Sequence, residues 1–435
     1  MQITGGLQAD TAERNVEAHG SDGLVAGGVD SDIAGKPQAR RHPALNVRGG
    51  LHLTYPDDFV KYKLSEPDFN VVAVSAATLS IIIPVFNDRD SLEKLLADLG
   101  RQRGAITEVL VVDGGSSDGA EEVVGLFSRR VAWTLRWLVA PAAGRGVQMN
   151  TGAQAAGGDD LLFLHADSRL MHPTMLADAA QYFSRWRRCR RSEAVAGHFN
   201  LEFSEVGPQA GLGYYYFAAK TALNRPECIN GDQGLWIARE FFFRCGGFDE
   251  SLPYMEDARF ARRLQATVHW VLLPGTLLTS ARRFVREGFA SRQLLNALLR
   301  LFDQLQRPDF FQRAEGAYRC QAAARRLHVG PFLKIAHEVM GDGGGRAWLR
   351  AWWDAAQLVS DNVWQVFYFF DCYRHYRRGG RSAAVIGGAL FWFERRLRCY
   401  CRQRVFVAMT MVLCVAFFYG CWGVATIAGR LRQPF

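Results

Sequence analysis

Three short acidic segments carry the side chains that could do chemistry in this sequence. The first is Asp113, which opens the turn Gly114-Gly115-Ser116-Ser117-Asp118-Gly119. Backbone N–H groups in a glycine-rich turn can approach a ligand closely, and a carboxylate there can accept from a nucleobase N–H or a ribose hydroxyl. Turns in α/β proteins also often carry Asp and Gly, so this segment alone leaves ligand binding and a purely structural turn open.

The second segment is His165-Ala166-Asp167, directly after the apolar run 161–164. An acid at such a position, beside bound phosphates, is a natural ligand for Mg²⁺ or Mn²⁺, because these ions prefer oxygen donors. The ion would offset the negative charge that builds on a departing diphosphate. The alternatives are that Asp167 caps the next turn and that His165 is a packed histidine.

The third segment is Glu256-Asp257, which Arg262 and Arg263 follow. An acid placed against an acceptor hydroxyl can take its proton while that oxygen attacks a carbon centre. These arginines, with Arg282 and Arg283, could hold diphosphate oxygens through bidentate contacts. A solvated helix with ion pairs four residues apart is the alternative.

These acids need a scaffold that brings strand ends together, and the sequence predicts one. Leu79–Val85 is apolar on both faces and rich in β-branched residues, as in a strand buried on both sides. Asp90 and Glu93 mark the start of a helix. Strands alternating with helices imply βαβ units, a mainly parallel sheet, and ligands at the carboxyl ends of its strands. Further strands are predicted over 109–112, 134–139 and 161–165, with helices up to about 127 and over 147–156.

Taken in order, the motifs strongly resemble family 2 glycosyltransferases of the GT-A fold, an α/β, Rossmann-like domain predicted here over 76–305. Two further segments, 231–234 and 279–283, bring the resemblance closest to the radical-SAM/selenodomain-associated transferases. The motifs are Ser80-Ile81-Ile82-Ile83-Pro84-Val85-Phe86-Asn87, Val111-Val112-Asp113-Gly114-Gly115-Ser116-Ser117-Asp118-Gly119, Gly144-Arg145-Gly146-Val147-Gln148-Met149-Asn150-Thr151-Gly152, Phe163-Leu164-His165-Ala166-Asp167-Ser168 and Met255-Glu256-Asp257.

The resemblance implies how a nucleotide-sugar donor would be bound. Pro84, Phe86 and Asp113 would line the pocket for the nucleobase and ribose, as the matching positions do in the family. Arg145 and Asn150 would lie near the ribose or the phosphates. UDP-sugars are the commonest donors of such families, so a UDP-sugar is the favoured donor.

The resemblance also implies a metal-dependent, inverting transfer of the sugar to an acceptor hydroxyl. Asp167 looks like the last acid of the family's D-x-D metal motif, which makes it the expected ligand of Mg²⁺ or Mn²⁺. Asp257 looks like the catalytic base, with Glu256 beside it. The sequence departs from the family at His165, which replaces the first acid of the metal motif.

Other classes of protein fit the sequence less well. A nucleotidyltransferase would carry a glycine-rich, Lys- or Arg-bearing loop after the first strand, where Asn87-Asp88-Arg89-Asp90 stands instead. The net charge of +9 and the arginine-rich run 185–191 suggest nucleic acid, but no nucleic-acid motif accompanies them, so no such partner is predicted. A non-catalytic protein of the same fold that binds a nucleotide-sugar or a lipid is the alternative.

The two ends of the chain differ from this domain. Residues 1–75 are predicted to be disordered, and 306–403 to form a helical, aromatic and basic region. Residues 404–429 are apolar enough, and long enough, to form a transmembrane helix. Five arginines precede the uncharged run 405–429 of this helix and two follow it, which favours a single-pass C-terminal anchor with the catalytic domain on the cytosolic side. A membrane anchor favours a lipid-linked acceptor. These arginines are Arg395, Arg396, Arg398, Arg402 and Arg404 before the helix, and Arg430 and Arg432 after it.

Overall fold

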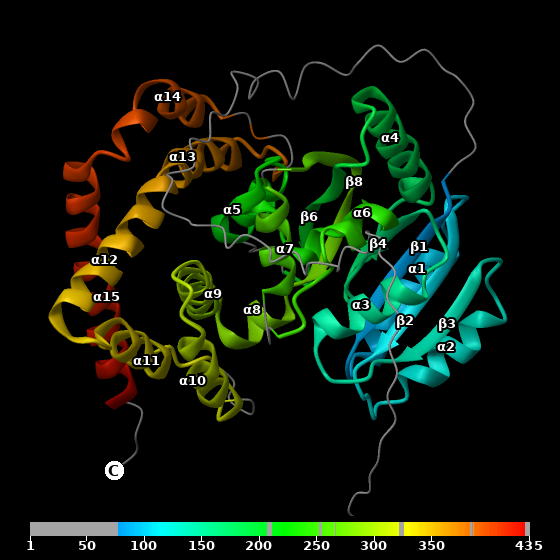
Figure 1. The fold of residues 1–435 in the computed structure, drawn as a ribbon, viewed down its shortest axis with the longest axis horizontal. Helices are drawn as coiled ribbons and strands as arrows, with labels where there is room; N and C mark the ends of the chain where they lie inside the picture. The colour runs from blue at the N-terminus through cyan, green and yellow to red at the C-terminus, as the bar shows by residue number, and fades with distance from the viewer. Residues whose placement is uncertain are drawn as a thin grey trace, which may run out of the picture. The chain divides into compact units, whose positions relative to one another are not determined.

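The structure is a computed structural model that describes residues 77–206, 211–251, 255–265, 267–321, 326–382, 385 and 387–430. The predicted disorder of residues 1–75 lies outside these residues. Figure 1 shows the arrangement of the described helices and strands.

A mixed sheet organises the first part of the described chain (Figure 1). Its strands stand in the order β3-β2-β1-β4-β7-β6-β8-β5. Neighbours β3, β2, β1 and β4 are parallel, and so are β6 and β8, whereas β7 and β5 run antiparallel to their neighbours. The predicted α/β fold is confirmed. The strands are β1 (Leu79–Val85), β2 (Ile106–Asp113), β3 (Thr134–Val139), β4 (Asp160–Phe163), β5 (Arg169–Leu170), β6 (Val195–Ser204), β7 (Leu235–Ala238) and β8 (His269–Ser280).

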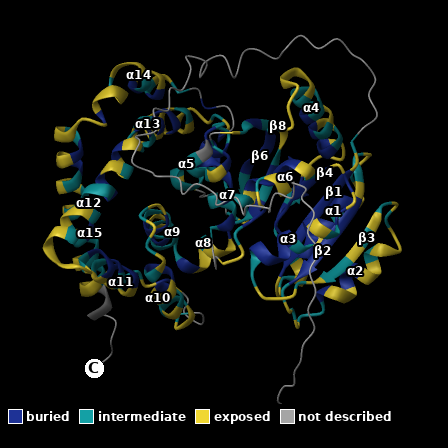
Figure 2. Ribbon diagram, viewed as in Figure 1, coloured by how far each residue is buried: buried dark blue, intermediate teal, exposed yellow. Residues whose placement is uncertain are grey.

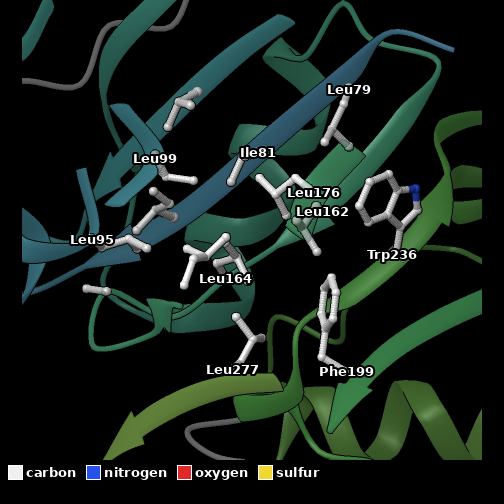
Figure 3. Close-up of a cluster of buried hydrophobic side chains, with 14 of the residues drawn as sticks. Leu79, Ile81, Leu95, Leu99, Leu162, Leu164, Leu176, Phe199, Trp236 and Leu277 are labelled. Atoms are coloured by element: carbon white, nitrogen blue, oxygen red, sulfur yellow. The ribbon is translucent and has the colours of Figure 1, made fainter. Parts of the chain in front are cut away.

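Helices cover both faces of this sheet because its central strands carry apolar side chains on both faces. On one face, Ile81 of β1 packs with leucines of α1 and with Leu176 of α4 (Figure 3). On the other face, Ile82 packs with Met149 of α3 and with Phe260 of α7. The helices of this part are α1 (Arg89–Gly100), α2 (Ala120–Ser128), α3 (Arg145–Ala155), α4 (Met175–Arg190), α5 (Leu212–Thr221), α6 (Arg239–Arg244), α7 (Glu256–Leu264) and α8 (Arg282–Glu287).

Gly152 lets α3 lie close against the sheet. A Cβ atom at this position would stand 2.5 Å from Ile82 Cγ2 and 3.0 Å from Val112 Cγ2. We expect Gly152→Ala to lower the free energy of unfolding by about 1–3 kcal/mol, because overpacking a core forces side chains and backbone to shift. Gly125 in α2 is the matched control, since no atom lies within 4 Å of its added Cβ. Gly125→Ala is expected to be neutral or stabilising by up to about 1 kcal/mol. Urea unfolding of the two variants checks this, and equal stability would contradict it.

The rest of the described chain is helical, as predicted. Leu298 and Phe302 of α9 pack with Phe332 of α11 and Trp352 of α12 in one apolar cluster. A second cluster joins α13 and α14 to α5, where the Tyr368 hydroxyl donates to the Ala219 carbonyl at 2.9 Å. These helices are α9 (Phe289–Gln304), α10 (Pro308–Arg319), α11 (Gly330–Gly341), α12 (Gly344–Asp361), α13 (Trp364–Arg377), α14 (Gly388–Arg396) and α15 (Arg404–Arg430).

The last helix is the predicted membrane segment. Among the described residues, one helix passes the length and hydropathy test for a membrane span, and it is the stretch Arg404–Ile427 of α15. Most of this stretch is exposed or half-buried (Figure 2). Length and composition alone do not tell a spanning helix from one that lies on a membrane.

Candidate active site

The ends of β1, β2 and β4 bring the first two predicted acidic segments to one edge of the sheet. Phe86 follows β1, Asp113 ends β2, and Asp167 comes four residues after β4. Since these three strands are parallel neighbours, their carboxyl ends meet. The predicted grouping of Phe86, Asp113 and Asp167 at one edge therefore follows from the strand order.

Pro84 explains why the chain leaves the sheet after β4. The pairing of β1 with β4 ends at Ile82 and Phe163, and Leu164 N–H donates to the Ile82 carbonyl at 3.0 Å. Alternate residues of a strand direct their backbone groups to the same neighbouring strand. Pro84 stands two residues after Ile82, so its backbone also faces β4, but proline has no N–H to donate there. The ladder cannot continue there, and the segment from His165 to Asp167 turns away from the sheet. Pro84 itself is buried.

Asp113 shapes the glycine-rich turn that it opens. Its carboxylate accepts from Gly115 N–H at 3.1 Å and from Ser116 N–H at 3.0 Å. Asn87, in the left-handed region with φ 48°, joins the turn after β1 to this one, because its side-chain oxygen accepts from Ser117 N–H at 2.9 Å. Phe86 is 61% exposed beside these turns. An exposed aromatic ring at this edge is suited to pack on a flat nucleobase.

Gln148 of α3 is a residue of this edge that the sequence did not single out. Its side-chain amide donates to the carbonyls of Val85 and Val112, both at 2.8 Å. It therefore ties α3 to the ends of β1 and β2, where the Val85 carbonyl also accepts from Gly114 N–H at 2.9 Å. The predicted site residue Asn150 of α3 instead donates to the Phe248 carbonyl at 2.9 Å and to Glu250 Oε1 at 2.8 Å. Its described contacts thus hold the 248–250 loop.

The histidine that replaces the first acid of the metal motif has an acidic partner. His165 Nδ1 lies 2.7 Å from Asp232 Oδ1. Burial and Arg145 act to lower the pKa of His165, but the hydrogen bond to Asp232 and the charges of Asp232 and Asp167 outweigh them and raise it. Within the described residues His165 Nε2 has no hydrogen-bond partner, although it is buried. Asp232 lies in the segment 231–234 that supported the family resemblance, yet its pairing was not predicted.

Asp167 and Asp232 form an acidic pair that suits a cation. Burial and the nearby carboxylate of Asp232 raise the pKa of Asp167. The Asp232 side chain is 51% exposed, so its partial burial opposes ionisation only in part, and His165, Arg145 and Arg283 hold its pKa well below the usual value. Among the described residues no three His, Cys, Asp or Glu side chains are gathered in a ready-made metal site. The two carboxylates nevertheless supply the oxygen donors that Mg²⁺ or Mn²⁺ prefer, and these ions keep waters and take phosphate oxygens as further ligands.

The third acidic segment begins α7 and reaches the same place. Glu256 is 1% exposed, and its carboxylate accepts from Arg145 Nε. Asp257 is half-buried and accepts from Gly231 N–H at 2.6 Å through Oδ2. Met255, just before them, has a φ of 69°. Non-glycine residues in this strained region cluster at active sites.

Gly231 lies between the expected base and the metal motif. A Cβ atom on Gly231 would stand 2.3 Å from Asp257 Oδ2 and 2.9 Å from His165 Nε2. A small pocket has His165, Gly231 and Asp257 in its lining, together with apolar side chains such as Phe163. The structure therefore brings together side chains that are about 90 residues apart in the chain.

The predicted phosphate-binding arginines separate into two groups. Arg282 donates to both carboxylate oxygens of Asp88, with Nη1–Oδ1 at 2.7 Å, and its charge acts on Asp167. Arg283 is exposed, and its charge acts on Asp232. Arg262 instead bonds to Asp303 of α9. The first two arginines thus lie near the acidic pair, whereas Arg262 ties α7 to α9.

Comparison with known proteins finds a match to a protein family. Residues 80–188 match the model of the family described as glycosyl transferase family 2. An uncharacterized glycosyltransferase of Mycobacterium tuberculosis is 38% identical over 112 residues, which are 25% of this chain and 41% of that protein. A PGL/p-HBAD biosynthesis glycosyltransferase of Mycobacterium bovis is 33% identical over 111 residues, 25% of this chain and 43% of that protein. The chain spans about two fifths of the length of these curated relatives.

A solved structure is similar over more of the chain. A mannosyltransferase from Pyrobaculum calidifontis, in complex with GDP-Man and Mn²⁺, covers 81% of this chain and 91% of its own, at 16% identity and a TM-score of 0.43. The matched family segment, 80–188, contains Asp113, Arg145 and Asp167 but ends before Asp232 and Asp257. The match to the family model therefore covers the part of the sheet that carries the first two acidic segments.

Proposed function

We propose that this chain is a metal-dependent, inverting glycosyltransferase that moves a sugar from a nucleotide-sugar to an acceptor hydroxyl at a membrane surface. One observation carries the proposal: His165, which pairs with Asp232, meets Asp257 at Gly231, and Asp167 lies close enough to Asp232 for the two charges to interact. The family match to residues 80–188 supports a glycosyl group as what is transferred.

The donor is bound by the ends of β1 and β2 and by the nearby arginines. The exposed ring of Phe86 packs on the nucleobase, and the Asp113 turn offers polar groups to the base and ribose. Arg282, which Asp88 holds in place, and the exposed Arg283 supply positive charge beside the diphosphate. Asp167 and Asp232 hold Mg²⁺ or Mn²⁺, which when bound offsets the charge of the departing diphosphate. A UDP-sugar is the favoured donor.

Asp257 acts on the acceptor. Its carboxylate takes the proton of the acceptor hydroxyl while that oxygen forms a bond to the anomeric carbon and the bond to the diphosphate breaks. One displacement of this kind inverts the anomeric configuration. The Gly231 N–H fixes one carboxylate oxygen of Asp257 at 2.6 Å, so the base is already oriented. Buried Glu256 neutralises Arg145 beside it and is less accessible to an acceptor.

The membrane part of the proposal rests on α15 and the basic residues before it. The cluster of arginines before the helix supports a catalytic domain on the cytosolic side, because the cytoplasmic leaflet is anionic. A lipid-linked hydroxyl is the acceptor that such a location offers. The subgroup of radical-SAM/selenodomain-associated transferases remains part of this proposal.

A donor panel tests the function. Thermal shift and hydrolysis are measured with UDP-, GDP- and other nucleotide-sugars, each with and without Mn²⁺. We expect one nucleotide class to raise the melting temperature and to be hydrolysed slowly, both in a Mn²⁺-dependent way. Binding without hydrolysis or transfer would point to the non-catalytic alternative, and no response to any donor would contradict the proposal.

The Asp232–His165 pair gives a prediction about donor binding. Asp232→Asn is expected to weaken Mn²⁺-dependent donor binding by about 10–100-fold, the usual cost of losing a group that orients or supports a metal site. Titration calorimetry with and without Mn²⁺ measures it. Asp178→Asn, the same change at an exposed position of α4, is the control. Unchanged Mn²⁺-dependent donor binding in Asp232→Asn would show that Asp232 does not take part in metal binding.

A further inference from the structure

Helix α15 has one exposed face that is apolar along its whole length. The exposed fractions of its members range from 61% to 72%, and the residues recur at spacings of three, four or seven, so they share one side of the helix. Figure 2 shows these exposed stretches on α15. The members are Val405, Met409, Val412, Leu413, Phe417, Val424 and Ile427.

The opposite face of α15 is packed against other helices. Phe418 lies edge-on to Trp352 of α12, with ring centroids 5.3 Å apart. The Tyr419 hydroxyl lies 2.9 Å from His337 Nδ1 of α11. At the start of α15, Arg402 bonds to Asp361 at the end of α12, at 3.0 Å. The helix is therefore held along its length by α11 and α12, as Figure 1 shows for α12.

These contacts conflict with a spanning position. If α15 crossed the hydrocarbon core in this packed state, α12 would enter it too. Helix α12 carries Arg346, Arg350 and Asp354, and α11 carries Lys334 and Glu338. Charged side chains in the hydrocarbon core are costly. A spanning α15 would have to abandon the apolar cluster that it shares with α11 and α12.

The surroundings of α15 suit the interface of an anionic membrane. Exposed aromatic side chains stand on the helix before it, Phe391 and Trp392 of α14, and Tyr400 follows them. The exposed arginines of this stretch carry a positive charge next to these rings. An apolar helix face with aromatic and basic residues at its edge binds in the plane of a membrane and favours anionic lipids. The arginines are Arg395, Arg396, Arg398, Arg402 and Arg404.

We propose that α15 lies in the plane of one leaflet of an anionic phospholipid bilayer, with its exposed apolar face towards the acyl chains. Both ends of α15 then stay on the side of the catalytic domain. This arrangement is an alternative to the single-pass topology that the sequence predicts, and it does not depend on the reaction that the chain catalyses. The glycosyltransferase proposal and the membrane proposal can therefore fail separately.

A topology experiment on the full chain distinguishes the two arrangements. The protein, with an epitope tag after Phe435, is bound to sealed vesicles of phosphatidylglycerol and phosphatidylcholine and treated with protease from outside. An in-plane helix leaves the tag accessible, so it is digested together with the catalytic domain. A tag that is protected until detergent is added shows a spanning helix and overturns the proposal.

A pair of variants tests the lipid-facing side. Phe417→Glu is expected to reduce flotation with these vesicles at least about tenfold, whereas Leu126→Glu, at an exposed leucine of α2, leaves it unchanged. Wild-type flotation should fall on vesicles of phosphatidylcholine alone and at high salt. Failure of the wild type to float, with self-association in solution instead, would show that a second copy covers this face and would overturn the proposal. Equal flotation of the two variants would do the same.

Discussion

Asp167→Asn is expected to lose nearly all glycosyl transfer while the fold stays intact. Asp167 lies at the carboxyl edge of the sheet near Asp232, and burial together with the Asp232 carboxylate raises its pKa. The bound ion supplies several kcal/mol of charge stabilisation in the transition state, so its loss costs about 10²-fold or more in rate. Initial rates and Mn²⁺-dependent nucleotide binding, both measured against the wild type, check this.

The Asp167→Asn substitution separates an effect on metal binding from an effect on folding. An amide has nearly the volume of the carboxylate, so the melting temperature of Asp167→Asn in the absence of metal should stay close to that of the wild type. The exposed Asp178→Asn variant controls for the loss of one negative charge. Full activity in Asp167→Asn, or equal wild-type activity in EDTA, would show that Asp167 does not hold a required metal.

Much of the sheet could be predicted because each strand is indicated by a short, local pattern of residues. Leu79–Val85 and Thr134–Val139 were predicted as strands, and these are the bounds of β1 and β3. Short apolar runs between helical patterns, as at 79–85, 109–112 and 161–164, favour strands buried on both faces, whereas β3 is half-exposed at the edge of the sheet. The positions of Asp113 and Asp167 at strand ends followed from these runs together with the rule for parallel sheets.

The long-range pairs of the site were not predictable in the same way. His165 pairs with Asp232, and Arg145 with Glu256, across 67 and 111 positions. Both depend on how the chain after β5 returns to the sheet, where β7 joins β4 in the antiparallel direction. A local pattern does not specify that return. The sequence showed that His165 had replaced an acid, but not that an acid from another segment stood beside it.

The arginines and the last helix also show that a local sequence pattern does not specify long-range partners. The sequence grouped Arg262 and Arg263 with Arg282 as candidates for phosphate binding, yet Arg262 bonds to Asp303 of α9. The apolar run 404–429 was correctly predicted to be a long helix. Composition could not tell that Phe418 would be packed while Phe417 beside it would be 67% exposed. Which face of an element is covered depends on its partners.

Asp257→Asn is expected to lower kcat by about 10²–10⁴-fold, the usual cost of losing a positioned general base. Donor affinity should change little, because the described contacts of Asp257 are with Gly231 and Ala258, away from the turns expected to bind the nucleoside. The asparagine side chain can still accept from Gly231 N–H, so the loop keeps its place. Steady-state kinetics with a saturating acceptor, together with donor titration, measure the two effects separately.

Glu256→Gln is the matched control, one position earlier in the same helix. Glu256 is buried against Arg145, so this change should weaken an ion pair and lower stability more than it lowers kcat. Asp257→Asn should show the reverse, with kcat strongly reduced and unfolding little changed. If donor binding collapses in Asp257→Asn while kcat holds, Asp257 is a binding residue. Glu256 then becomes the candidate base, and its own variant should carry the loss of rate.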